Sequence, residues 1–258
     1  MDMDAPTALD ASERRERTDL AAAFRLTARF GWHEAVANHF SLALDPEGRR
    51  ILINPRWRHF ARIRASDLLL LDVDDPDVMR RPDAPDPTAW CIHGALHRLR
   101  PEVRCVLHTH MPYATALTSL EDSRVLPIDQ NCARFWGRIA YDEDYGGLAL
   151  AEEEGLRMAE ALGNKPVLFL KNHGVIVTGR SVAHAFDELY YLEQACRQLV
   201  LAYSTGRPLR LISDNLAARV AGEWAEYDGF ADAHFAELKA LLDGDGTSYA
   251  DCRAGRRA

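Results

Sequence analysis

Residues 103–110, with the sequence VRCVLHTH, constrain the fold of this chain more than any other stretch. Apolar side chains recur at every second position from Val103 to Leu107, and this period of two is typical of a β-strand. Residues two apart on a strand point to the same face, so His108 and His110 project together with their Cα atoms about 7 Å apart. Two imidazoles in this arrangement can bind one metal ion at about 2.1 Å. The stretch therefore predicts a strand that ends in part of a metal site.

A third ligand is predicted at His173, within the sequence Asn172-His173-Gly174. Apolar runs at residues 167–170 and 175–177 flank it, so we expect a short turn between two strands with His173 at the strand end. Gly174 permits a tight backbone or a close approach to another group. Three nitrogens with an open side are the plan of a catalytic metal site rather than a closed structural one. The alternative, histidines that only fill the core, explains any one of them but not the combined pattern.

Several motifs in the same order resemble the class II aldolase/adducin family over residues 20–206. The resemblance implies an α/β fold, in which a three-layer α/β/α domain has a central, largely antiparallel sheet. It also implies one divalent metal ion (Zn, Fe, Mn or Co) and a homo-oligomer, commonly a tetramer with the site at a subunit boundary. The motifs are Ala37–Ser41, Ile53–Pro55, Ile92–Ala95, His108–Ala114 and Leu170–Val175.

The chain departs from the phosphosugar aldolases of this family where those enzymes hold a phosphate. They carry a Gly-Asn-x-Ser-like stretch and then Thr-Pro-Ser/Thr-Gly, and the matching positions here are residues 37–41 and 54–57. Asn38 remains, but Trp57 stands where glycine would admit backbone N–H groups to an anion. We therefore expect a small, non-phosphorylated substrate, with Asn38 among its contacts. Arg56 is predicted to bind a carboxylate through its planar fork, with an ordinary surface arginine as the alternative.

A second departure concerns proton transfer. In the aldolases that the chain resembles, a glutamate stands four residues before the position of His93, and here that residue is Ala89, which cannot carry a proton. The catalytic candidates are therefore His93, Tyr145 and Gln130. His93 is chosen by its position in the family pattern. Tyr145 and Gln130 are chosen as polar groups near predicted strand ends, where simple turn chemistry is the alternative for each.

Three functions fit these residues. The first is a metal-dependent lyase that cleaves a C–C bond of a small hydroxy or keto acid, by retro-aldol cleavage or decarboxylation. The second is an Fe(II)- and O2-dependent non-haem oxygenase acting on an aromatic hydroxy or keto acid. This reading follows a branch of the family that makes prenylated hydroxybenzoate in aminocoumarin pathways. The third is a non-catalytic scaffold like the adducins, which is disfavoured because a scaffold does not need the three histidines.

Composition limits the remaining possibilities. A chain of 258 residues, 47% of them hydrophobic, suits one domain, expected at residues 12–242 between disordered ends at 1–11 and 243–258. The net charge of −8 argues against nucleic-acid binding. No apolar run approaches the roughly 18 residues that span a membrane, and the N-terminus lacks the apolar region of a signal peptide. Five widely spaced cysteines without a Cys-x-x-Cys motif indicate reduced thiols in the cytoplasm.

Periodicity and capping signals predict the remaining elements. Ser12, Thr88 and Ser181 are the expected N-caps of three helices. Helices are expected at 12–30, 88–99, 151–162, from 182 to just before Gly206, and at 215–242. Strands are expected at 38–44, 50–54, 66–72, 103–110, 125–128 and 138–141, and on both sides of His173.

Overall fold

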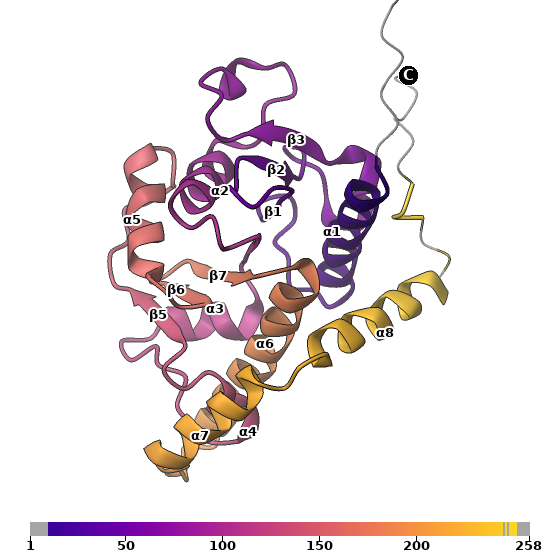
Figure 1. The fold of residues 1–258 in the computed structure, drawn as a ribbon. Helices are drawn as coiled ribbons and strands as arrows, with labels where there is room; N and C mark the ends of the chain where they lie inside the picture. Colours follow the sequence, from indigo (N-terminus) through magenta and orange to yellow (C-terminus); the bar gives the residue numbers. More distant parts are fainter. Residues whose placement is uncertain (1–9, 245, 247, 252–258) are drawn as a thin grey trace, which may run out of the picture.

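A seven-stranded sheet forms the centre of the molecule (Figure 1). The structure, a computed structural model, describes residues 10–244, 246 and 248–251. The strand order is β3-β2-β1-β4-β7-β6-β5, and all neighbouring strands are antiparallel except β5 and β6. The predicted α/β class with a largely antiparallel sheet is thus confirmed. The strands are β1 (His39–Ala43), β2 (Arg50–Ile53), β3 (Leu69–Asp72), β4 (Cys105–Thr109), β5 (Ile139–Asp142), β6 (Val167–Leu170) and β7 (Gly174–Gly179).

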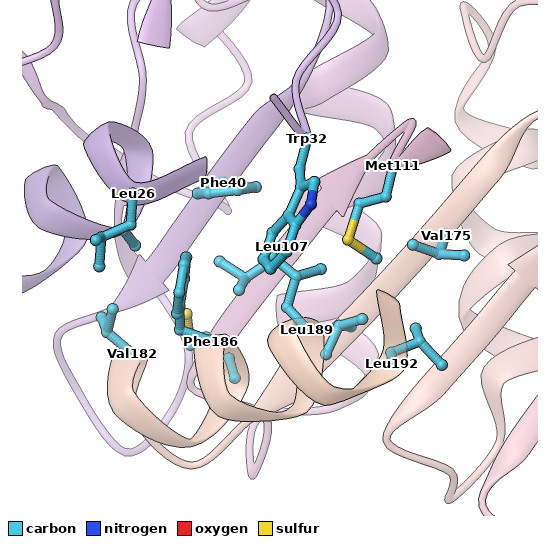
Figure 2. Close-up of a cluster of buried hydrophobic side chains, with 14 of the residues drawn as sticks. Leu26, Trp32, Phe40, Leu107, Met111, Val175, Val182, Phe186, Leu189 and Leu192 are labelled. Carbon is cyan, nitrogen blue, oxygen red and sulfur yellow. The ribbon is translucent and has the colours of Figure 1, made fainter. Parts of the chain in front are cut away.

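Helices cover both faces of this sheet. One face packs against α1 (Ala11–Arg29), α6 (Val182–Ser204) and α8 (Phe230–Gly244), and Figure 2 shows part of that cluster. The other face packs against α2 (Pro87–Leu99) and α5 (Glu152–Leu162). The remaining helices are α3 (Pro112–Thr118), α4 (Gln130–Arg134) and α7 (Asp214–Ala225), with 3-10 turns η1 (Phe60–Arg62), η2 (Ala65–Asp67) and η3 (Val78–Arg80).

Strand β4 lies in the middle of the sheet, between β1 and β7. All of its residues are buried, because helices cover both faces. Leu107 joins the cluster formed with α1 and α6, whereas Val106 joins the cluster formed with α2 and α5. The predicted alternation is present, but it separates two buried faces rather than an inner face from an exposed one. His108, two residues after Val106, is consequently held inside the protein.

The caps of two helices differ from the predictions. Helix α1 is capped by Asp10 rather than Ser12, because the Asp10 carboxylate accepts the Glu13 N–H at 2.7 Å. Helix α2 is capped by Asp86 rather than Thr88, with Pro87 at the first helical position. Proline is favoured there because the N–H it lacks would have no partner within the helix. Ser181 caps α6 as predicted.

Two predicted strands are also corrected. Residues 125–128 form no strand, because their backbone groups find partners outside the sheet: the Val125 N–H donates to the Tyr141 hydroxyl and the Pro127 carbonyl accepts from Ile212. The predicted strand at residues 66–72 is a 3-10 turn followed by a strand of only four residues. The strand expected at 138–141 is present as β5.

The C-terminal part of the chain forms two helices rather than the one expected at 215–242. Gly229 has a φ of +77° and separates α7 from α8. The disorder predicted for residues 1–11 and 243–258 falls largely outside the described residues. The described residues within these two ranges are ordered. Helix α1 begins at Ala11 and α8 ends at Gly244. Tyr249 is buried, and its carbonyl accepts the Ala65 N–H.

Among the described helices, none combines the length and apolar character that crossing a bilayer requires. The four described cysteines are free thiols.

Candidate metal centre

The structure brings His108, His110 and His173 together at the end of β4. One ligand nitrogen from each ring lies within 4.8 Å of the others. The ring centroids are 5.0 Å apart for His108 and His110, and 4.9 Å and 4.8 Å from these two to His173. His108 is the last but one residue of β4, His110 follows the strand, and His173 ends the turn between β6 and β7. The antiparallel pairing of β4 with β7 is what joins these distant segments.

The hydrogen bonds of His108 and His110 involve Nδ1 of each ring and leave Nε2 available to bind a metal ion. His108 Nδ1 donates to the Val175 carbonyl at 3.0 Å, and His110 Nδ1 contacts the Glu34 carboxylate. In a neutral imidazole the other nitrogen, Nε2, then carries a lone pair. The two Nε2 atoms face each other at 3.2 Å. A tetrahedral ion with bonds of about 2.1 Å would space them by about 3.4 Å, so the donor set fits a divalent metal ion.

Gly174 makes the close approach of β7 to His110 possible. A Cβ atom at this position would lie 2.6 Å from the Thr109 carbonyl oxygen and 2.7 Å from His110 Cδ2. Neither the strand backbone nor the His110 ring has room for it. Asn172, two residues before Gly174, has a φ of +54°, which asparagine tolerates better than most residues. The turn sequence therefore determines how closely His173 can approach the end of β4.

Behind these rings lies a buried chain of polar side chains. His39, on β1, is paired directly opposite His108 in the strand register. Its Nδ1 is 2.8 Å from Nε2 of His93, whose Nδ1 is 2.5 Å from the Ser41 hydroxyl. The same hydroxyl is 2.7 Å from Nε2 of His97. His93 and His97 are fully buried, so His93 supports His39 rather than facing a substrate.

Burial keeps these histidines neutral. It lowers the pKa of His39 to about 3, of His97 to about 4 and of His173 to about 4. It also lowers the pKa of His108 and His93 well below the usual value for histidine. Neutral imidazole is the form that binds a metal ion, so His108 and His173 are ready to do so at neutral pH.

The three histidines open into a cavity of about 440 Å³. Tyr145 lines it, with its ring centroid 6.4 Å from that of His173. Thr88 and His39 are also at its wall. None of the described lining residues is lysine or arginine, and Glu34 is the one acidic side chain among them. The lining residues are Glu34, Ala37, His39, Thr88, Ile92, His108, His110, Thr115, Tyr145, Gly147, Leu148, Ala149, Asn172 and His173.

Four of the other predicted site residues lie away from this cavity wall. Asn38 is buried, and its Oδ1 accepts the Glu34 N–H at 2.7 Å, so it holds the neighbouring loop. Arg56 is 3.5 Å from Asp86 and lies over the Trp57 ring. Gln130 lies at the start of α4 and lines a separate pocket with α7 residues. His93 is enclosed behind His39. These four residues are not among the described residues that line this cavity, and their roles in the site stay predictions.

Two residues at the site were not selected from the sequence. Glu34 has no local sequence signal that distinguishes it from a solvated loop residue, and its contact with His110 depends on where the loop after α1 is placed. His39 belongs to the motif Ala37–Ser41, but its position opposite His108 depends on the register of β1 with β4. Neither the loop path nor the register has a local sequence signal. The period-two spacing of His39 and Ser41 is the one clue that they share a strand face.

Comparison with known proteins agrees with this architecture. Residues 18–200 match the family described as Class II Aldolase and Adducin N-terminal domain. A protein named as an aldolase class 2 protein from Caulobacter vibrioides is 34% identical over 206 residues, which is 80% of this chain and 79% of that protein. Alpha-adducin from Rattus norvegicus is 31% identical over 210 residues, which is 80% of this chain but 28% of the adducin.

Solved structures lead to the same family. An aldolase II superfamily protein from Pseudomonas syringae has a TM-score of 0.85 and 33% identity, covering 95% of this chain and 98% of its own. L-fuculose 1-phosphate aldolase from Glaciozyma antarctica has a TM-score of 0.78 at 23% identity, covering 96% of each chain, and shows a shared fold. By its sequence and its architecture, this chain belongs to the class II aldolase and adducin N-terminal domain family.

Proposed function

We propose that this protein is a metal-dependent lyase that cleaves a C–C bond of a small, non-phosphorylated hydroxy or keto acid. His108, His110 and His173 would hold one divalent ion, zinc, iron, manganese or cobalt. The observation that carries the proposal is the pair of Nε2 atoms facing each other at 3.2 Å, each with its Nδ1 occupied elsewhere. At this distance the two nitrogens must share either a proton or a metal ion, because two lone pairs facing each other repel, and the proposal takes the metal ion.

The electrostatics of the cavity support a non-phosphorylated substrate. A phosphate needs several converging donors, such as backbone N–H groups or cationic side chains. The described cavity wall has no lysine or arginine and includes the Glu34 carboxylate. Ile92 and Leu148 add apolar surface. A small molecule with one carboxylate, neutralised by the metal, suits this wall better than a phosphorylated sugar.

In such a site a bound metal ion would polarise a carbonyl or carboxylate and stabilise an enolate. The protein supplies the remaining chemistry. Ala89 packs in the core and offers no carboxylate. Tyr145 reaches the cavity from the loop after β5, and we assign its hydroxyl the transfer of a proton to or from the substrate. His39 lines the same cavity and is held from behind by His93, and we assign it the role of orienting the substrate.

An Fe(II)- and O2-dependent oxygenase is the second candidate. It is favoured by Ala89, because a side chain without a donor leaves only three protein ligands and keeps more positions open for substrate and dioxygen. The commoner iron site has two histidines and one carboxylate, and the three histidines here are equally suited to zinc. The adducin-like scaffold is the third candidate. A scaffold gives no physical reason for the nitrogens of three histidines to lie within 4.8 Å of one another.

Elemental analysis of protein purified anaerobically without added metal separates these candidates. Near-stoichiometric zinc, manganese or cobalt is expected for the lyase, followed by assays with hydroxy and keto acids. Near-stoichiometric iron would favour the oxygenase and call for oxygen-uptake assays with aromatic hydroxy acids. If the protein contains no metal and takes up none on titration, the scaffold remains.

Substitution of the ligands is the first prediction. His108→Ala and His173→Ala should each abolish metal binding while the far-ultraviolet circular dichroism stays that of the parent protein. The reason is that each removes one of three nitrogens, whereas the sheet depends on the backbone pairing of β4 with β7. Stoichiometric metal in both variants would contradict the assignment.

The assembly and location are proposed from the family. We propose a cytoplasmic homotetramer without nucleic-acid or membrane partners, in which a neighbouring subunit closes the cavity near Tyr145. Light scattering coupled to gel filtration measures the assembly directly, and a monomeric mass would contradict it.

A further inference from the structure

Glu34 is the one acidic side chain among the described residues of the cavity wall. It lies on the loop between α1 and β1, and its carboxylate contacts His110 Nδ1. The opposite nitrogen of the same ring, Nε2, faces His108 Nε2 at 3.2 Å. The carboxylate and the proposed metal position are therefore on opposite sides of one imidazole.

The loop that carries Glu34 is held in place by its own residues. Asn38, which is 2% exposed, accepts the Glu34 N–H at 2.7 Å, and the Glu34 carbonyl accepts the Ala37 N–H at 2.8 Å. Trp32, two residues before Glu34, is packed in the core near Phe186 (Figure 2). The Trp32 ring also meets the Tyr190 ring edge to face, with ring centroids 5.5 Å apart.

The backbone of this loop is also strained. Ala35 has a φ of +46°, a left-handed conformation that is unfavourable for a residue with a Cβ. Such strain persists only where the surrounding structure imposes it, and it concentrates at functional sites.

Electrostatic stability alone does not account for this arrangement. The Glu34 side chain is 64% exposed, and exposed ion pairs stabilise a protein very little. The contact instead affects the ring that it holds. A carboxylate accepting the Nδ1–H of a histidine determines which nitrogen carries the proton, holds the ring in one orientation and makes the other nitrogen a better ligand. Val175 holds His108 in the same way through its carbonyl.

We propose that Glu34 is a positioning residue that sets the metal affinity of the site through His110, with Asn38 holding the loop in place. This proposal rests on the proposed metal site formed by the three histidines. It assigns a role to the loop after α1, which contributes no metal ligand of its own. Removal of a partner of this kind weakens metal binding by about 10- to 100-fold in other proteins.

The test is a competition titration of the full-length, metal-free protein with Zn²⁺ and a chromophoric chelator. The variants are Glu34→Ala and Glu34→Gln, with Glu102→Ala as the matched control. Glu102 is 62% exposed and pairs with Arg100, away from the cavity. Co²⁺ absorption spectra of the same proteins report the geometry of the site. His108→Ala, in parallel, tests the metal site itself.

We expect Glu34→Ala to bind Zn²⁺ about 10- to 100-fold more weakly and to alter the Co²⁺ spectrum. Glu34→Gln should bind with intermediate affinity, because its amide oxygen still accepts the His110 proton without the charge. Glu102→Ala should bind like the parent protein. Thermal unfolding of the metal-free proteins should be unchanged, which distinguishes positioning from a folding defect.

Equal affinity of Glu34→Ala and the parent protein would overturn the role of Glu34 and leave the metal site intact. Equal weakening in Glu102→Ala would also overturn it, because the effect would then come from net charge. Zn²⁺ binding that survives in His108→Ala, or is absent from the parent protein, would overturn the metal site and the role of Glu34 together.

Discussion

At the scale of single residues, the candidate metal centre depends on backbone positions that tolerate little change. Gly174 lets β7 pass close to His110, and Asn172 adopts a φ of +54° in the turn before it. Trp57 has a φ of +58° at a position where the phosphosugar aldolases carry glycine. Trp57 therefore adopts a left-handed backbone conformation that glycine would adopt at lower cost. The backbone geometry at Gly174 and at Trp57 predicts the effects of substituting these two residues.

Gly174→Ala should destabilise the protein by about 1–3 kcal/mol, because the new methyl group would overlap the Thr109 carbonyl and the His110 ring. It should also weaken metal binding by moving His110. Urea unfolding measures the first effect and metal titration the second. Gly222→Ala is the control: this exposed position in α7 has nothing within 4 Å of the added methyl group, so alanine should stabilise by about 0.5–1 kcal/mol. If the two substitutions have the same effect, the close approach at Gly174 is not important.

Trp57→Gly should be more stable than Trp57→Ala by about 1 kcal/mol, because alanine keeps the strain of a left-handed backbone and glycine removes it. The Trp57 side chain is 67% exposed, so both substitutions lose much the same contacts, including the one with Arg56. Chemical unfolding of the two variants measures the difference. An alanine variant as stable as the glycine variant would show that the loop relaxes without cost.

At the scale of elements, the site is an assembly of strand ends and one loop. The β1–β4 register places His39 opposite His108, and the β4–β7 pairing brings the turn with His173 to the end of β4. Helices hold these strands from outside the sheet. The C-terminal helices are attached through Arg134 on α4. Its guanidinium contacts the rings of Tyr191 and Trp224 and pairs with Asp187 and Glu188.

Arg134→Ala should reduce the free energy of unfolding by about 3–5 kcal/mol, because it leaves Asp187 buried without its cation. Asp187 also contacts His234 of α8, so α8 should loosen first. Chemical unfolding and hydrogen exchange measure these effects. Arg219→Ala, which breaks an exposed pair with Glu223, should change stability by about 0.5 kcal/mol or less. Equal losses in both variants would contradict the structural role of Arg134.

At the scale of the whole molecule, a group of neutral histidines lies buried beside the sheet, and this couples stability to pH. Burial lowers the pKa of His39 to about 3 and of His97 to about 4, and it also lowers the pKa of His93, His108 and His173. The unfolded chain binds protons at these residues below about pH 6.5, whereas the folded protein resists them. Their contribution to stability is complete above pH 6.5 and is lost as the pH falls.

We therefore expect the metal-free protein to lose stability steadily between about pH 6.5 and pH 4. Burial raises the pKa of Glu193 to about 7, which has the opposite sign, since a protonated Glu193 favours the folded state below that pH. On acidification, the stability lost through the five histidines exceeds the stability gained through the single carboxyl group of Glu193. Urea unfolding across this range measures the slope, and His97→Gln should reduce it. A pH-independent free energy of unfolding would contradict the buried, neutral state of these rings.

The sequence by itself determined most strands of the sheet, the family pattern and the choice of the three histidines, because each has a local signal. Alternation marks β4, a glycine after His173 marks the tight turn, and the spacing of His108 and His110 follows from strand geometry. It did not determine the N-caps at Asp10 and Asp86, because several residues near each helix start can accept the same backbone hydrogen bonds.

Only the tertiary structure decided which polar residues share the cavity. It places Glu34 and His39 there and leaves Gln130, Arg56, Asn38 and His93 outside its wall. The physical reason is that residues far apart in the chain meet through strand register, loop path and the packing of α2 against the sheet. These depend on the whole folded chain, and a residue's type and immediate neighbours do not encode them.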